Sequence, residues 1–159
     1  MGFPETTQSS PNFSATPPHE KLGVLFHHSV LPFHDAIGRL TDPASAVSYH
    51  CLIGHDGTRC TLVPDDVIAW HAGESAFLGR TRCNDFLLGV AFAGDSYLAP
   101  LTPEQLGSAI ERLASRWTRY GWTIDRMTDH RQVAPRRKDD LNPVEWHRLR
   151  ALIATTFSP

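Results

Sequence analysis

Short apolar runs, separated by polar and turn-forming segments, dominate the first two thirds of the sequence. Their lengths and the turn residues that bound them are typical of buried strands, and we expect strands at residues 23–27, 46–53, 59–63, 68–73 and 86–92. Asp56-Gly57 stands between the second and third runs, and this dipeptide favours a tight turn between antiparallel strands. The pattern therefore predicts a sheet that contains at least one hairpin.

Apolar residues recur at helical spacing in the last third of the chain. Thr102 and Gln105 form a capping box around Pro103, a combination that marks the start of a helix. The buried stripe of this helix would consist of Leu106, Ile110, Leu113 and Trp117. Pro143 opens another helix, whose buried stripe would consist of Trp146, Leu149 and Ile153. Residues 31–42 are compatible with a short helix or with an irregular loop.

Strands that precede and alternate with helices are typical of an α/β domain. We expect a central mixed β-sheet flanked by helices, in a single domain that comprises residues 22–159. Residues 1–21 are rich in Pro, Ser and Thr and contain few apolar anchors. We interpret them as a flexible N-terminal arm that lies on the surface or is disordered.

Composition narrows the classes of function. A net charge of −2 gives no support for nucleic-acid binding by bulk attraction. No apolar run approaches the ~18 residues that a membrane span needs, and no secretory signal is recognisable at the N-terminus. We therefore expect a cytoplasmic protein, with export by a route without a signal peptide as the alternative. Three cysteines favour free thiols in a reducing compartment, although Cys51 and Cys60 could pair across a hairpin.

Candidate chemistry concentrates in places that are far apart in the sequence. His27 and His28 end the first expected strand, and His130 lies in a polar loop. Asp140 follows ten residues later and is preceded by Lys138. Two imidazoles and a carboxylate are a common ligand set of catalytic zinc, which keeps one position open for water. Taken singly, the histidine pair is also compatible with packed side chains, and the charges around Lys138 with a solvated surface.

Four blocks of the sequence resemble the zinc amidases of the type 2 N-acetylmuramoyl-L-alanine amidase family, which includes phage lysozyme-amidases and animal peptidoglycan recognition proteins. The blocks, similar to the family in order and spacing, are residues 24–29, 48–53, 70–73 and 130–135. The resemblance covers roughly residues 22–155 and implies the fold of that family. Residues 79–86 and the spacing from His130 to Lys138 and Asp140 are most similar to the bacterial amidases that recycle anhydro-muropeptides.

The resemblance implies a metal centre and catalytic residues. It implies one zinc ion per chain, with His27, His130 and Asp140 as ligands. It also implies that Lys138 points at the substrate carbonyl oxygen, where a cation stabilises the developing negative charge. Tyr49 matches a tyrosine that some phage members use near the metal-bound water, so a catalytic role is expected for it. His28 would point away from the metal.

The resemblance further implies hydrolysis of the lactyl–L-alanine amide bond in peptidoglycan or muropeptides, by a protein that we expect to be monomeric. The residues implied in substrate binding are His50, His71, Arg82 and Asn84. A structural role is the alternative for the two histidines, and an exposed loop position is the alternative for Arg82. The stretch from His27 to His50 is shorter than in the recycling enzymes, which leaves both soluble fragments and intact cell wall open as substrates.

One position departs from many bacterial members of the family. They carry a catalytic glutamate in a Gly-Ile-Glu strand, and Ala91 stands at that place here. A general base contributes about 10²–10⁴-fold to a rate. Phage relatives without the glutamate are still amidases, so activity through Tyr49 is favoured over a replacement by Glu74 or Asp95. The alternatives are a catalytically weakened protein that only binds peptidoglycan or muropeptides, and a closed structural zinc site.

Overall fold

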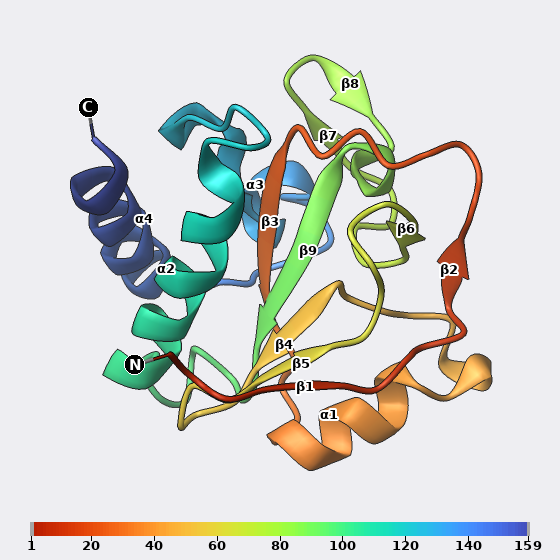
Figure 1. Ribbon diagram of the computed structural model, residues 1–159, viewed down its shortest axis with the longest axis horizontal. Coiled ribbons are helices and arrows are strands. Elements are labelled where there is room, and N and C mark those ends of the chain that lie inside the picture. The colour runs from red at the N-terminus through yellow and green to blue at the C-terminus, as the bar shows by residue number, and fades with distance from the viewer. Residues whose placement is uncertain (1, 159) are drawn as a thin grey trace.

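The computed structural model describes residues 2–158 and is built around a six-stranded mixed β-sheet (Figure 1). In spatial order its strands are β1 (Glu5–Thr7), β5 (Arg59–Thr61), β4 (Cys51–Ile53), β9 (Leu87–Phe92), β3 (Gly23–His28) and β10 (Met127–Asp129). β4 and β5 form the antiparallel hairpin that Asp56-Gly57 predicts, and every other neighbouring pair in this sheet is parallel. The expected central mixed sheet is confirmed.

Helices cover both faces of this sheet. They are α1 (Phe33–Leu40), α2 (Pro103–Trp117), α3 (His130–Val133) and α4 (Pro143–Phe157). α2 and α4 lie side by side and share one apolar cluster with Phe26 and Val90 (Figure 1). α1 packs against Leu52 and Ala91, which belong to a second cluster. Within residues 2–158, no helix combines the length and the apolar character that crossing a membrane would require.

The expected helix boundaries are close to those observed, whereas the strands expected at 46–53, 59–63 and 68–73 are shorter than predicted. The capping box is present, because the Thr102 side chain accepts from the Gln105 backbone N–H and the Gln105 side chain accepts from the Thr102 N–H. Residues 31–42 contain a helix, α1. The run at 46–53 forms a strand only from Cys51, and Ala46 at its start has a positive φ of 51°, outside the extended conformation.

The remaining elements are short. They are β2 (Phe13–Ser14), β6 (Ile68–Ala69), β7 (Ala76–Phe77), β8 (Arg80–Thr81), and the 3₁₀ turns Pro43–Ser45, Cys83–Asp85 and Ile124–Arg126. β2 pairs with β6 and β7 pairs with β8. Cys51 and Cys60 are buried free thiols, and the register places Cys60 opposite Leu52, so the two thiols belong to different apolar clusters.

Alternation along β3 positions the first candidate ligand. Successive strand residues point to opposite faces of a sheet. Phe26 points into the cluster under α2 and α4, so His27 points to the other face, where it meets His71 and Tyr49. β3 and β9 lie in the middle of the sheet and are buried on both faces, which explains their nearly continuous apolar sequences.

The prediction of a flexible arm at residues 1–21 is wrong for the part that the structure describes. β1 adds an edge strand to the sheet by pairing with β5, and β2 pairs with β6. Ser10, Asn12 and His19 are buried. The Asn12 side chain donates to the backbone carbonyls of Leu40, Asp42 and Val47. Polar side chains that hydrogen-bond to distant carbonyls therefore anchor this segment in place of apolar residues.

We predict that Asn12→Ala lowers the free energy of unfolding by about 1–3 kcal/mol, because it removes the buried side-chain donor that the Leu40, Asp42 and Val47 carbonyls share. Denaturant unfolding followed by circular dichroism measures the change. Gln8→Ala is the matched control, since the exposed Gln8 bonds through its backbone N–H alone. Equal stability of the two variants would mean that the segment is not anchored through Asn12.

Candidate metal centre

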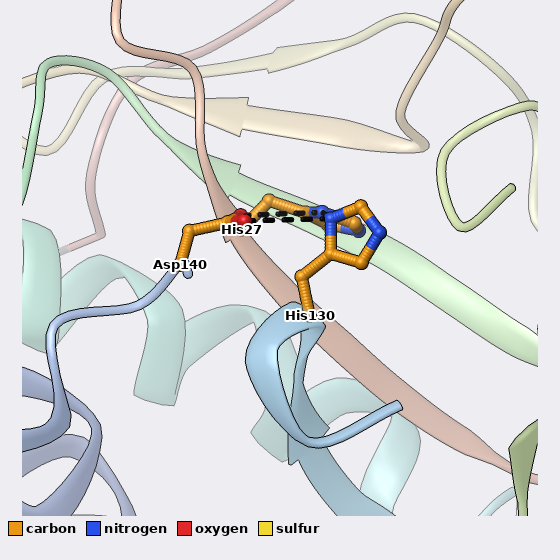
Figure 2. A group of neighbouring side chains, drawn as sticks. All are labelled: His27, His130 and Asp140. Carbon is orange, nitrogen blue, oxygen red and sulfur yellow. Dashed lines mark hydrogen bonds and ion pairs between the residues drawn. The ribbon is translucent and has the colours of Figure 1, made fainter. Parts of the chain in front are cut away.

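Three buried side chains from separate segments converge at one edge of the sheet (Figure 2). His27 comes from the end of β3, and His130 is the first residue of α3, directly after β10. β3 and β10 are adjacent parallel strands with Phe26 opposite Asp129, so the residues that follow these two emerge side by side. Asp140, from the loop before α4, completes the group.

The facing atoms of this group lie close together. His27 Nδ1 and His130 Nδ1 are 3.0 Å apart. The two carboxylate oxygens of Asp140 lie 3.6 Å from His27 Nδ1 and 3.5 Å from His130 Nδ1. The three residues are 1%, 5% and 5% exposed, so water cannot solvate them freely. The backbone N–H of His28 donates to Asp140 Oδ2 at 3.3 Å and orients the carboxylate.

The hydrogen bond on the far side of His130 fixes its tautomer. His130 Nε2 lies 3.0 Å from the carbonyl oxygen of Ala72. A carbonyl oxygen only accepts, so Nε2 must carry the proton. In the neutral ring, His130 Nδ1 is therefore a bare lone pair directed at His27 and Asp140.

A longer chain of hydrogen bonds fixes the tautomer of His27. His71 Nε2 lies 3.1 Å from the carbonyl oxygen of Leu87 and must donate to it, which leaves His71 Nδ1 as an acceptor. His27 Nε2 is 2.9 Å from His71 Nδ1 and must donate in turn. Burial lowers the pKa of His27 to about 4 and lowers the pKa of His71 well below its usual value, so both rings are neutral at pH 7. His27 Nδ1 is thus a second bare lone pair.

The donor set fits a divalent cation. Two nitrogen lone pairs and an anionic carboxylate face one another across about 3–4 Å without a proton between the rings. Such an arrangement is repulsive unless a cation lies among the three groups. Two imidazoles and one carboxylate are a ligand set of catalytic zinc sites. The three residues predicted as metal ligands are therefore brought together in a geometry that can hold a metal ion.

A cavity of about 640 Å³ opens beside the group, and His130 and Asp140 form part of its wall. Lys138 and Tyr49 line the same cavity. The Tyr49 ring lies 4.9 Å from the His27 ring, centroid to centroid. Burial and the negative charge of Asp140 raise the pKa of Tyr49, so its hydroxyl remains a hydrogen-bond donor at neutral pH. Both predicted catalytic residues thus face the space next to the candidate metal site.

The residues predicted to bind substrate differ in position. Asn84 and His71 line the cavity. The Arg82 side chain is 80% exposed, pairs with Asp85 at 3.2 Å and is not part of the cavity wall, so its role stays a prediction. His50 is fully buried, accepts from the Gly89 N–H and bonds the Val67 carbonyl through Nε2. His50 is not part of the cavity wall, so its contact with substrate stays a prediction, and these bonds support the structural role that the sequence left as the alternative.

His28 and the acidic residues around it lie beside the main group. The His28 ring is held by Ser96, whose N–H donates to His28 Nδ1 at 3.1 Å. Asp95 lies 3.8 Å from the same nitrogen, and neither Asp95 nor Glu74 lines the cavity. The charged residues of the cavity wall to which the sequence assigned no role are Arg39, Arg137 and Asp139. They lie on loops or at a helix end, where hydrophobic periodicity does not predict which way a side chain points.

Ala91 lies next to the site but carries no chemistry. It is paired with His27 in the register of β3 and β9 and is fully buried. Its methyl group belongs to the apolar cluster formed with α1, which includes Ile37 and Leu40. Among the cavity-lining residues of the described chain, Asp139 and Asp140 are the carboxylates.

Comparisons with known proteins agree with this geometry. A family model described as N-acetylmuramoyl-L-alanine amidase matches residues 17–143. The 1,6-anhydro-N-acetylmuramyl-L-alanine amidase AmpD of Salmonella typhimurium (strain SL1344) is 36% identical over 167 residues, which cover 91% of this chain and 88% of AmpD. The N-acetylmuramoyl-L-alanine amidase AmiD of Escherichia coli K12 is 32% identical over 142 residues, which cover 79% of this chain and 51% of AmiD.

Solved structures show the same relationship. A crystal structure of an AmpD derivative superposes with a TM-score of 0.81 at 32% identity and covers 94% of both chains. A complex of AmiD from E. coli with anhydro-N-acetylmuramic acid-L-Ala-D-gamma-Glu-L-Lys superposes with a TM-score of 0.73 at 31% identity, covering 86% of this chain and 59% of AmiD. With a family model that spans most of its length and relatives of this similarity, the chain belongs to the N-acetylmuramoyl-L-alanine amidase family.

Proposed function

We propose that this protein is a zinc-dependent amidase that hydrolyses the bond between the lactyl group of N-acetylmuramic acid and L-alanine in peptidoglycan or muropeptides. The observation that carries the proposal is the convergence of two bare imidazole nitrogens and a carboxylate at the wall of a cavity. His27, His130 and Asp140 would hold one Zn²⁺ per chain. The names of AmpD and AmiD support the reaction, and the AmiD complex supports a muropeptide as substrate.

The metal and the chain divide the chemistry between them. When bound, zinc polarises a carbonyl oxygen and makes an attacking water more acidic. Lys138 reaches the same cavity and carries a positive charge, so it would stabilise the negative charge that develops on the lactyl carbonyl oxygen. The Tyr49 hydroxyl, held as a donor by its raised pKa, would contribute a hydrogen bond to an oxygen in the same space.

The burial of His27 and the position of His130 and Asp140 at the cavity both favour a catalytic metal site. His27 is 1% exposed, and its neutral ring needs no proton to be released when a cation binds at neutral pH. His130 and Asp140 border the cavity, so a cation held there faces the substrate space on that side. An accessible side is what distinguishes a catalytic zinc site from a closed structural one.

A binding protein without turnover is the second candidate, and Ala91 is the observation that favours it. The family glutamate is absent, and the buried Ala91 side chain, which belongs to an apolar cluster, supplies no carboxylate at that place. A protein of this kind would hold a muropeptide in the cavity and release it unchanged. The two candidates differ in whether a free stem peptide is formed.

We predict that removal of the metal with a strong chelator abolishes cleavage of an anhydro-muropeptide and that added Zn²⁺ restores it. The expected product is a stem peptide with a free L-alanine amino group, which mass spectrometry detects. Circular dichroism before and after chelation shows whether the fold persists. Undiminished turnover of the metal-free protein would contradict zinc dependence, and a zinc-loaded protein that binds the muropeptide without cleaving it would favour the binding candidate.

We predict that Lys138→Ala lowers kcat by about 10²–10³-fold, the usual effect of removing one group that stabilises an oxyanion. The exposed Lys138 side chain makes no packing contribution, so the unfolding free energy should change by less than about 0.5 kcal/mol. Arg136→Ala is the matched control, because Arg136 is an exposed cation two residues away that does not line the cavity. Equal kcat values in the two variants would remove Lys138 from the mechanism.

A further inference from the structure

We infer that His71 is a positioning residue of the metal centre, which fixes the tautomer and direction of His27, and that the adjacent Ala72 carbonyl does the same for His130. The inference rests on the metal site of the proposed function. It changes the role that the sequence suggested for His71, from contact with substrate to control of a ligand.

The His71 ring is set as an acceptor towards His27. Its Nε2 bonds the Leu87 carbonyl at 3.1 Å, so its Nδ1 is left to accept from His27 Nε2 at 2.9 Å. The two rings meet at 86°, with centroids 5.0 Å apart. The Leu87 carbonyl can only accept, so it fixes the tautomer of His71 and, through His71, that of His27. The proton of His27 is therefore kept on Nε2, away from Nδ1, which faces Asp140.

The next residue serves the second histidine. The Ala72 carbonyl accepts from His130 Nε2 at 3.0 Å, and the Arg137 guanidinium donates to the same oxygen at 3.0 Å. One dipeptide, residues 71–72, therefore sets the orientation of both imidazoles. Any shift of this dipeptide would turn His27 and His130 together.

Two features hold the dipeptide in place. The Asn84 side-chain oxygen accepts from the backbone N–H groups of His71 and Ala72, at 3.0 and 2.8 Å. Gly89 leaves room for the ring, because a Cβ built at Gly89 would lie 2.7 Å from His71 Cγ. The position of His71 is thus fixed from its backbone and from the strand beneath it.

Loss of the His71 ring should act on metal binding before it acts on catalysis. Without an acceptor, the His27 Nε2–H is buried and unpaired, and the ring gains by rotating or by moving its proton to Nδ1. Either change removes the lone pair that faces Asp140. Partners of this kind contribute about 10–100-fold to metal affinity in other proteins.

The experiment compares His71→Ala with His19→Ala. His19 is a suitable match, because it is 2% exposed and bonds the same Leu87 carbonyl at 3.0 Å. The Zn²⁺ dissociation constant of each folded variant is measured without substrate, by competition with a chelator of known affinity, and the visible absorption bands of bound Co²⁺ report ligand geometry. We expect His71→Ala to weaken zinc binding by about 10–100-fold and to alter the Co²⁺ bands. His19→Ala should leave both unchanged.

His71→Asn provides the rescue, because its carboxamide oxygen can occupy the place of Nδ1 and accept from His27. Zinc affinity in this variant should exceed that of His71→Ala. If His71→Ala does not fold, Asn84→Ala against Asn84→Asp decides the matter, since aspartate keeps the oxygen that holds the dipeptide. Weaker zinc binding in Asn84→Ala alone supports the inference, and equal binding in both overturns it.

The outcomes separate this inference from the proposed function. Wild-type affinity and unchanged Co²⁺ bands in His71→Ala would overturn the positioning role and leave the metal centre standing. A wild-type protein that takes up no zinc would overturn the metal centre itself. Zinc binding that depends on His71 in a protein without amidase activity would support the inference while contradicting the enzyme.

Discussion

Two nitrogen lone pairs held 3.0 Å apart, on His27 and His130, are the constraint on which the rest of this site depends. Their approach follows from the parallel pairing of β3 with β10, which delivers both residues to one edge of the sheet. Neither ring can turn away, because the groups behind them are carbonyl oxygens or a histidine that is itself fixed by one. The backbone thus sets the protonation pattern of the site before any metal arrives.

Ala91 leaves the place of the family glutamate without a carboxylate. This residue is adjacent to His27 in the sheet and belongs to the same apolar cluster as Ile37 and Leu40 of α1. A methyl group can neither take up nor release a proton, so other groups on the walls of the cavity must carry that part of the chemistry.

Sequence patterns predicted the elements with strong local signals, such as the buried strand that ends in His27 and the capped helix from Pro103. The patterns failed where polar contacts between residues far apart in the sequence determine the structure. Residues 1–21 have few apolar anchors, but Asn12 is tied to carbonyls about thirty residues away, which no periodicity records. His50 and His71 looked alike in sequence, and the fold alone places His50 wholly inside and His71 at the cavity wall.

The cost of this arrangement bears on the choice between an enzyme and a binding protein. Burying three electron-rich groups face to face destabilises the metal-free fold, and a cation bound among them would offset that cost. The cavity walls also offer Arg39, Lys138 and Asn84 for polar contacts, so a metal ion is not needed merely to hold a muropeptide. The electrostatics of the site therefore favour a bound cation at the cavity wall, which is the group that hydrolysis requires, even with Ala91 in place of the family glutamate.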